Sequence, residues 1–172
     1  VPVVLDLMIH DIDIILALVN SPVKNINASG VSILSDSLDI ANARLRFENG
    51  TVASITSSRI ARNKVRKIKI FQQDMYVTID FLLGLTEIYR VLDAEQNDTD
   101  AIETVPLDSY GSHKKIVYEK PDISQFDALE MELSNFIASI MGDETPIVNG
   151  QAGREALDVA IKIYDMILED IH

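Results

Sequence analysis

The sequence predicts an α+β domain with a large, predominantly antiparallel β-sheet and helices gathered on one face. Residues 41–48 alternate apolar and polar side chains, and Asn49-Gly50 follows them, which is a strong signal for a tight β-hairpin of type I′. Two apolar-periodic helical patterns close the chain at 124–141 and 151–171. Alternation across tight turns favours an antiparallel sheet with one covered face, so the other face stays open for oligomerisation.

The composition predicts one globular domain over residues 1–172. The chain is 47% hydrophobic and 24% charged, which is typical of a folded domain. A net charge of -12 argues against nucleic acid and against anionic membrane surfaces as partners. Apolar runs are too short to span a bilayer. The chain has no cysteine, which excludes disulfides and Cys-ligated metal sites and fits a reducing, cytoplasmic location.

The first element is predicted to be a helix over residues 3–20. One apolar ridge follows steps of three and four residues: Leu5, Ile9, Ile12, Leu16 and Val19. Further apolar side chains cover a second side, and a helix that is apolar nearly all round is a buried one. Asn20-Ser21-Pro22 ends the helix, because proline disfavours helical geometry in the preceding residue.

The middle of the chain is predicted to be a series of strands separated by turn residues. Their ranges are 23–34, 41–48, 51–61, 65–71, 75–82, 85–92 and 113–120. Residues 93–112 are polar and acidic, and we interpret them as a surface loop or irregular excursion.

Each of the two closing helices is predicted to turn an apolar face inward. For 124–141, this face carries Phe126, Leu129, Leu133, Phe136, Ile137 and Ile140. Gly142 supplies the C-terminal stop of that helix. For 151–171, the face carries Leu157, Ala160, Ile161, Tyr164, Ile167, Leu168 and Ile171.

A polar stripe interrupts the apolar first helix. Asp6, His10 and Asp13 follow steps of four and three, so they share one side of the helix, whereas Asp11 points elsewhere as a structural contact. A carboxylate beside an imidazole stabilises the imidazolium, and such a pair passes a proton near neutral pH. Two interpretations stay open at this point: a satisfied polar stripe that faces water, or one wall of a cleft.

Three ordered stretches give the chain a family resemblance. DLMIHDID resembles the Asp-x-x-x-His-Asp-x-Asp helix that opens the C-terminal domain of the glucose–fructose oxidoreductase/inositol dehydrogenase (Gfo/Idh/MocA) family. The hairpin followed by TSSRIARNKVRKIKIF is similar to the family's central strands. The ending GDETPIVNGQAGREALDVAIKIYDMI looks like its terminal helix. The matches span most of the chain in the right order.

The resemblance implies an NAD(P)-dependent oxidoreductase that acts on sugars, nucleotide sugars or cyclitols. His10 would then be the acid/base for the substrate hydroxyl, and hydride would pass to the nicotinamide. Asp6 would orient His10 and contact a substrate hydroxyl, and Asp13 would lie along the same rim as a substrate contact. Arg59 would reach the substrate from its strand, although a solvated strand residue is the alternative. The family's sheet face also implies a homo-oligomer, either a dimer or a tetramer.

A basic cluster is the one cationic segment of this acidic chain. Its members are Arg62, Lys64, Arg66, Lys67 and Lys69. A substrate phosphate or carboxylate could dock there. The alternative is the solvated side of a strand, because charged side chains are usually exposed.

No residues of this chain are predicted to bind the cofactor. A Gly-x-Gly-x-x-Gly phosphate loop is absent, so the resemblance assigns NAD or NADP to an N-terminal Rossmann domain. The opening VPVVLDLM lacks an initiator Met, and we expect a piece of a longer protein that is inactive alone. Tyr118–Asp122, YEKPD, imitates the family's Glu-Lys-Pro motif but lies far downstream, so Lys120 receives no catalytic role.

Two other classes remain as alternatives. His10-Asp11 looks like the doublet of metal-dependent phosphohydrolases, but only His113 and His172 remain as further ligands, so no metal site is predicted. A non-catalytic dimerisation or scaffold module could keep the same fold. Among substrates, oxidation at C3 of a UDP-N-acetylhexosamine is a hypothesis based on MIHDIDI, and a free sugar or cyclitol stays open.

Overall fold

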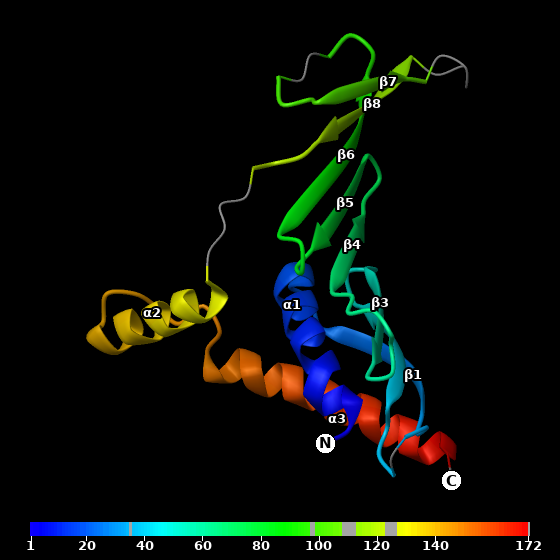
Figure 1. The fold of residues 1–172 in the computed structure, drawn as a ribbon, viewed down its shortest axis with the longest axis vertical. Helices are drawn as coiled ribbons and strands as arrows, with labels where there is room; N and C mark the ends of the chain where they lie inside the picture. Colours follow the sequence, from blue (N-terminus) through cyan, green and yellow to red (C-terminus); the bar gives the residue numbers. More distant parts are fainter. Residues whose placement is uncertain (35, 97–98, 108–112, 123–126, 172) are drawn as a thin grey trace. The chain divides into compact units, whose positions relative to one another are not determined.

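The computed structural model describes residues 1–34, 36–96, 99–107, 113–122 and 127–171. The chain divides into two compact units, Val1–Arg62 with Ser134–His172, and Asn63–Leu133. Every described strand pair is antiparallel, and helices accompany the strands, so the α+β prediction is confirmed (Figure 1). The strands form two sheets, of three and of five strands, each within one unit.

The first helix of the three-stranded unit begins with a π-helical turn, η1 (Val4–Met8), which continues into α1 (Ile9–Val19). This segment agrees with the helix predicted over 3–20. Its end is also as predicted: Asn20 has a left-handed φ of 46° and donates its N–H to the Leu16 carbonyl at 3.0 Å. Asparagine is one of the few side chains that adopt this conformation at a helix end.

The three-stranded sheet contains β1 (Val23–Val31), β2 (Ile40–Phe47) and β3 (Val52–Ser58) in that order. The predicted hairpin joins β2 and β3, but the predicted type I′ turn is wrong. Only Gly50 has a positive φ, of 88°, and Asn49 does not. Gly50 donates its N–H to the Phe47 carbonyl at 3.1 Å. This is a type I turn that a left-handed glycine closes, so one residue with positive φ is sufficient.

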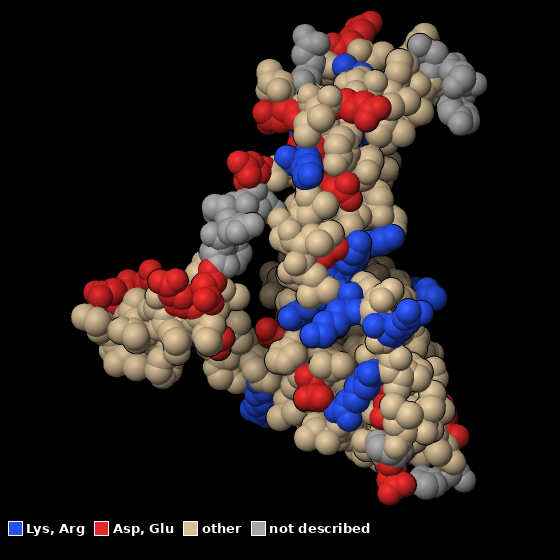
Figure 2. Space-filling view, in the orientation of Figure 1, with Lys and Arg blue, Asp and Glu red and all other residues tan. Residues whose placement is uncertain are grey.

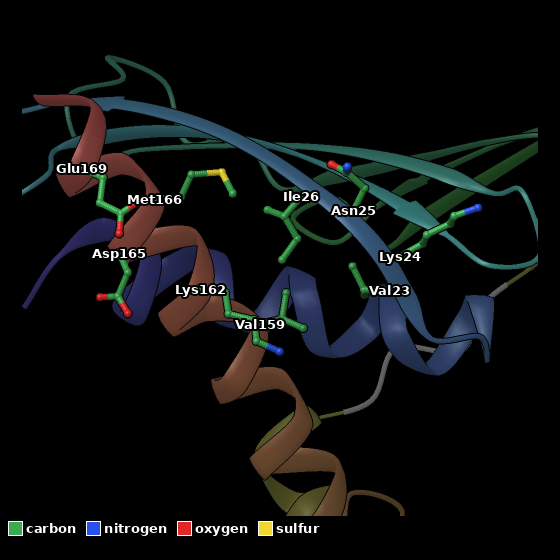
Figure 3. A pocket seen from close by; sticks show the side chains of 9 residues that line it. All are labelled: Val23, Lys24, Asn25, Ile26, Val159, Lys162, Asp165, Met166 and Glu169. Atoms are coloured by element: carbon green, nitrogen blue, oxygen red, sulfur yellow. The ribbon is translucent and has the colours of Figure 1, made fainter.

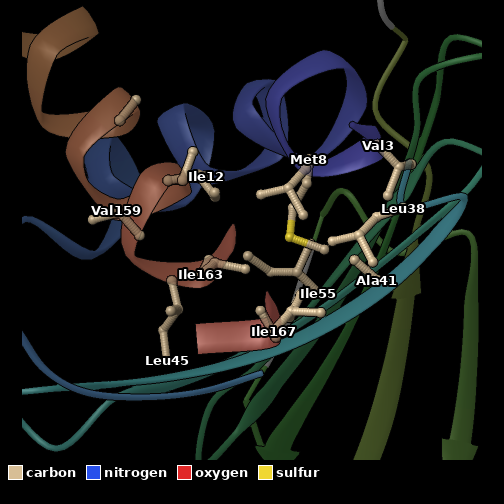
Figure 4. Packing of buried hydrophobic residues seen from close by; sticks show 14 of the residues in the cluster. Val3, Met8, Ile12, Leu38, Ala41, Leu45, Ile55, Val159, Ile163 and Ile167 are labelled. Atoms are coloured by element: carbon tan, nitrogen blue, oxygen red, sulfur yellow. The ribbon is translucent and has the colours of Figure 1, made fainter. Parts of the chain in front are cut away.

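The core of this unit lies between the sheet and two helices, α1 and α3 (Gly150–Ile171) (Figure 4). β2 contributes Ala41, Ala43, Leu45 and Phe47, which confirms the predicted alternation. The inner face of α3 consists of Ala156, Val159, Ala160, Ile163 and Ile167. The predicted face of that helix is therefore partly wrong, because Leu157 and Ile161 are 44% and 42% exposed. The buried face of α3 is shifted by about one residue from the predicted face, because the packing of α3 against β1 determines which side is buried.

Gly30 is the point where α3 comes closest to the sheet. A Cβ atom added there would lie 2.9 Å from Ile167 Cγ2 and 3.0 Å from the Ile40 carbonyl oxygen. Both separations are shorter than van der Waals contact, so any side chain at this position would force its neighbours to shift.

The second unit holds a five-stranded sheet. Its strands are β4 (Lys67–Phe71), β5 (Met75–Asp80), β6 (Leu85–Asp93), β7 (Glu103–Pro106) and β8 (Lys114–Glu119), and their order is β4-β5-β6-β8-β7. β7 lies inside the segment 93–112, so the loop prediction is wrong there. Thr104 and Val105 favour strand geometry, and β7 pairs with β8 from Glu103↔Tyr118 to Pro106↔Lys115.

Four aromatic rings cross this sheet in a row, one from each of β4, β5, β6 and β8. The ring centroids are 4.8 Å apart for Phe71–Tyr76, 5.6 Å for Tyr76–Tyr89 and 5.1 Å for Tyr89–Tyr118. The rings occupy directly paired positions, which is the arrangement that stabilises neighbouring strands most effectively.

α2 (Ala128–Met141) contradicts its prediction, because none of its residues is buried. Leu129, Phe136 and Ile140 of the predicted inner face are 62%, 61% and 70% exposed. Acidic side chains line one side of this helix and uncharged side chains the other (Figure 2). Phe126 lies outside the described residues. Gly142, with a φ of 84°, ends the helix as predicted. Within the described ranges, no helix is long and apolar enough to cross a membrane.

Candidate functional site

The predicted polar stripe lies on η1 and α1 of the three-stranded unit. Asp6 belongs to the π-helical turn, and His10 follows in the first turn of α1. Both side chains are exposed, and Asp13 is half-buried. A π-turn widens the spacing of the backbone, so residues four apart no longer align as they do in an α-helix, and such turns occur often at functional sites. In the described part of the chain, no hydrogen bond joins Asp6 to His10.

Asp6 pairs with Arg59, which follows the last residue of β3. The Arg59 Nη2 atom donates to Asp6 Oδ2 at 2.7 Å and also to the Val1 carbonyl oxygen. The Arg59 side chain is 26% exposed and that of Asp6 is 51% exposed. Two of the predicted site residues, distant in sequence, are thus brought together. The guanidinium fixes the Asp6 carboxylate in the first turn of the helix. The Asp6 carboxylate still stays accessible to a ligand.

A short segment, Leu38-Asp39, binds the backbone of Arg59 and of Val3, just before the helical turn that carries Asp6. The Leu38 carbonyl accepts from the Val3 N–H at 2.9 Å, and the Asp39 carbonyl accepts from the Arg59 N–H at 3.0 Å. The Asp39 residue is 3% exposed, and its Oδ2 atom accepts from the N–H groups of Ile33 and Leu34 at 2.7 Å and 2.6 Å. Sequence reasoning missed Asp39. A carboxylate directly before an alternating strand was the available signal.

His10 is an exposed residue of α1 and, in the described part of the chain, has no hydrogen-bond partner. An imidazole in this position is free to accept or donate a proton to a molecule beside the helix. The opening helix and the residue after β3 therefore offer a held carboxylate (Asp6), a guanidinium (Arg59) and, among the described residues, an imidazole without a hydrogen-bond partner (His10).

The basic cluster, except Arg62, belongs to the unit that holds the five-stranded sheet. All five of its side chains belong to exposed residues, as the solvated alternative expects. Lys67 instead forms an ion pair within the five-stranded sheet, where its Nζ atom lies 2.9 Å from Asp80 Oδ2. The ammonium of Lys67 lowers the pKa of Asp80, and the backbone N–H groups of Leu83 and Leu82 lower it further against the opposing effect of burial.

The metal alternative finds no support in the described part of the chain. There, no three His, Asp or Glu side chains are grouped as a metal ion would require. His113 is exposed just before β8, and His172 lies outside the described residues. Lys120, of the imitation motif, is likewise exposed after β8.

The described residues contain no cradle of the Rossmann type for a dinucleotide cofactor. A Rossmann site needs parallel strands joined by a crossover helix, with a glycine-rich loop at the helix N-terminus. All strand pairs among the described residues are antiparallel, and the seven glycines of the chain form no such loop.

The fold is that of the C-terminal domain of a family of two-domain proteins. Residues 2–77 match the family model described as the GFO/IDH/MocA C-terminal domain. This range contains Asp6, His10, Asp13 and Arg59. The resemblance to the Gfo/Idh/MocA family that was drawn from the sequence is confirmed.

Known proteins agree with this assignment. The chain is 31% identical over 163 residues to UDP-N-acetylglucosamine 3-dehydrogenase from Acidithiobacillus ferrooxidans, which covers 95% of the chain and 48% of that enzyme. A crystal structure of this dehydrogenase, GnnA, matches with a TM-score of 0.80 over 97% of the chain and 48% of the other, at 30% identity. The chain thus spans about half the length of the curated relative it matches.

Two more distant structures share the fold. An NAD-binding protein from Listeria innocua matches with a TM-score of 0.72 at 19% identity, over 98% of this chain and 46% of that one. The WlbA dehydrogenase from Bordetella pertussis, in complex with NADH and UDP-GlcNAcA, matches with a TM-score of 0.61 at 17% identity, over 94% and 41%.

Proposed function

We propose that this chain is the substrate-binding and catalytic domain of an NAD(P)-dependent dehydrogenase that oxidises a hydroxyl of a sugar, nucleotide sugar or cyclitol. The single observation that carries the proposal is the Asp6–Arg59 pair on the opening helix, which also carries His10 and lies within the range that matches the family model. The 31% identity to a UDP-N-acetylglucosamine 3-dehydrogenase, over 95% of the chain, supports the same class of reaction.

The proposed roles follow from the chemistry of alcohol oxidation. The reaction removes a proton from the hydroxyl and a hydride from its carbon. His10 accepts the proton, because a neutral imidazole is the suitable base near pH 7. Asp6, fixed by Arg59, accepts a hydrogen bond from a substrate hydroxyl and helps to orient His10. Arg59 offers a second donor to the substrate. Asp13 continues the rim as a further substrate contact.

The cofactor is proposed to bind a part of the complete protein outside these 172 residues. The antiparallel sheets of this chain offer no dinucleotide cradle among the described residues. The chain alone is therefore expected to show no turnover. A cytoplasmic location stays a prediction.

A nucleotide sugar is the substrate class that we favour. The support is the activity named for the Acidithiobacillus ferrooxidans enzyme, a UDP-N-acetylglucosamine 3-dehydrogenase, whose likeness covers nearly the whole chain. Oxidation at C3 of a UDP-N-acetylhexosamine is accordingly the first reaction to assay, followed by free sugars and cyclitols.

Self-association is proposed to use the uncovered five-stranded sheet. All extensive contacts of its described strands are with one another, and β6 is half-buried along nearly its whole length. Apolar side chains on a sheet face need a second layer to bury them. A second copy of the sheet supplies it, which makes a homo-oligomer, and the two units then act as one substrate-binding and oligomerisation domain.

The test is His10→Ala in the complete protein, with NAD+ or NADP+ and the candidate substrates. We expect kcat to fall about 10²- to 10⁴-fold, the usual contribution of an acid/base group. His113→Ala is the matched control, because it removes an exposed histidine from the other unit, and it should leave kcat unchanged. Unchanged turnover in His10→Ala would remove His10 from its role.

A second variant separates catalysis from scaffolding. Asp6→Asn keeps the shape of the side chain but loses the charge that pairs with Arg59, so we expect a raised KM together with a lower kcat. A complete protein that binds cofactor but oxidises no sugar, nucleotide sugar or cyclitol would instead favour the non-catalytic scaffold.

A further inference from the structure

A groove of about 430 Å³ lies between β1 and α3, and neither Asp6 nor Arg59 is among its lining residues (Figure 3). Both elements belong to the three-stranded unit. β1 contributes the first four of its residues, and α3 contributes one long side. The lining residues are Val23, Lys24, Asn25, Ile26, Val159, Lys162, Asp165, Met166 and Glu169.

The groove lies along the β1 edge of the three-stranded sheet, where no further described strand pairs with β1. β1 is an outer strand of the three-stranded sheet, paired with β2 on one side only. In an antiparallel pair, alternate N–H and C=O groups point away from the partner strand, so β1 presents a row of them along its open edge. α3 packs against β1 and α1, so the helical layer ends at the same edge. Strand and helix layers can therefore both be continued by a neighbour.

The charges along the groove are ordered. Lys24 lies at one end, and Asp165 and Glu169 lie toward the other (Figure 3). Lys162 stands between them and is held by Asp158 at 2.6 Å. Lys24 has no carboxylate partner among the described residues. Between the two ends, the half-buried Ile26 and Met166 provide apolar contact area.

We propose that a second copy of this chain docks in the groove, with its β1 antiparallel to the first across a two-fold axis. A two-fold axis reverses the direction of the groove, so Lys24 of one copy faces Asp165 and Glu169 of the other, and the same contact repeats symmetrically. β1 then pairs with β1 to give a six-stranded sheet, and α3 lies beside α3. A partner of a single charge sign would match only half of the groove. This interface is separate from the five-stranded sheet and does not depend on the proposed activity.

The experiment is a charge exchange in the complete protein, read by light-scattering mass. Lys24→Glu/Lys162→Glu and Asp165→Lys/Glu169→Lys each make both symmetric contacts repulsive, so each variant should have half the native mass. An equimolar mixture of the two variants makes both contacts attractive again, and we expect it to recover the native mass. The factor of two holds whether or not the five-stranded sheet also associates, so failure of one interface is distinguishable from failure of the other.

Glu155→Lys/Asp170→Lys is the matched control for Asp165→Lys/Glu169→Lys, because it makes the same change in charge on exposed positions of α3 outside the groove. It should keep the native mass. If a double variant fails to fold by circular dichroism, Lys24→Glu and Glu169→Lys replace the pairs. Amide hydrogen exchange along β1 should be slow in the native protein and faster in each folded variant. Native mass in the folded charge variants, or a mixture that does not recover it, would overturn the proposal.

Discussion

The two sheets of this chain bury their strands in different ways. In β2, every second residue from Ala41 to Phe47 is buried and those between are exposed. In β6, all residues from Leu85 to Leu92 are half-buried. The difference arises because α1 and α3 cover one face of the first sheet, whereas the described strands of the second contact mainly one another. Sharp alternation in burial therefore reports a covering layer rather than strand geometry alone.

The same difference predicts which interactions stabilise each unit. The three-stranded unit relies on a dry core of large side chains, each worth a few kcal/mol. The five-stranded unit relies on cross-strand pairs, such as the row of aromatic rings and the Lys67–Asp80 pair, which contribute less individually. Substitutions of the same kind should consequently have unequal effects in the two units.

The largest contrast is expected between two phenylalanines. Phe47 is 1% exposed in the core, and Phe71 is 74% exposed on the outer strand β4. Phe47→Ala should lower the free energy of unfolding by about 3–5 kcal/mol, because it removes a packed ring and leaves a cavity. Phe71→Ala should cost about 1 kcal/mol, the order of one stacked pair. Urea titration measures both, and equal losses would contradict the comparison.

A second contrast uses glycines in the helix-covered unit. Gly30→Ala should cost about 1–3 kcal/mol, because the new methyl group collides with Ile167 and with the Ile40 carbonyl. Gly153→Ala, in α3, meets nothing within 4 Å and should stabilise the protein by about 0.4–1 kcal/mol. Thermal unfolding of the two variants, which carry the same added atom, should shift in opposite directions. If Gly30→Ala stabilised the protein, this would show that α3 does not pack closely against β1 at this position.

The smallest effect, and the one with a pH dependence, concerns Asp80 in the uncovered sheet. Its pKa is lowered chiefly by Lys67, so its stabilising contribution is present above the ordinary carboxyl pKa of about 3.9 and is lost as the pH falls through the lowered value. Lys67→Met should raise the pKa of Asp80 toward its ordinary value and reduce stability at neutral pH. The difference from the native protein should vanish in strong acid. Carboxyl NMR titration follows the group directly.

Lys69→Met is the control for this titration, because Lys69 helps to lower the pKa of Tyr76 and is not among the causes of the Asp80 shift. It should leave the Asp80 titration in place. An Asp80 pKa that stays as low without Lys67 would assign the effect to the N–H groups of Leu82 and Leu83 instead.

Much of the fold follows from local pattern. The alternation in 41–48 and the Asn49-Gly50 pair located β2, the hairpin and β3, because both signals arise within a few residues. The apolar side of 124–141 was a real pattern, but the expected burial was wrong, since periodicity names a face and not its partner. β7 was missed because its four residues sit among acidic and polar neighbours, and its strand state depends on β8.

The candidate site was predictable only in part. The spacing of Asp6, His10 and Asp13 follows from helix geometry within one segment. The contact between Asp6 and Arg59 joins positions 53 residues apart, and no periodicity contains it. The π-turn at Asp6 is equally invisible to a pattern that assumes α-helical spacing throughout. Asp39 acts through backbone groups of its neighbours, which leave no mark on side-chain composition.

The row of stacked rings has a consequence for optical spectroscopy. The chain contains no tryptophan, and three of its five tyrosines, Tyr76, Tyr89 and Tyr118, belong to that row. Neighbouring phenol chromophores held about 5–6 Å apart couple their electronic transitions. The near-ultraviolet circular dichroism and tyrosine emission of this protein should therefore follow the five-stranded sheet, while far-ultraviolet helical signals follow α1, α2 and α3. Two wavelengths would thus record the loss of sheet and helices separately in one sample.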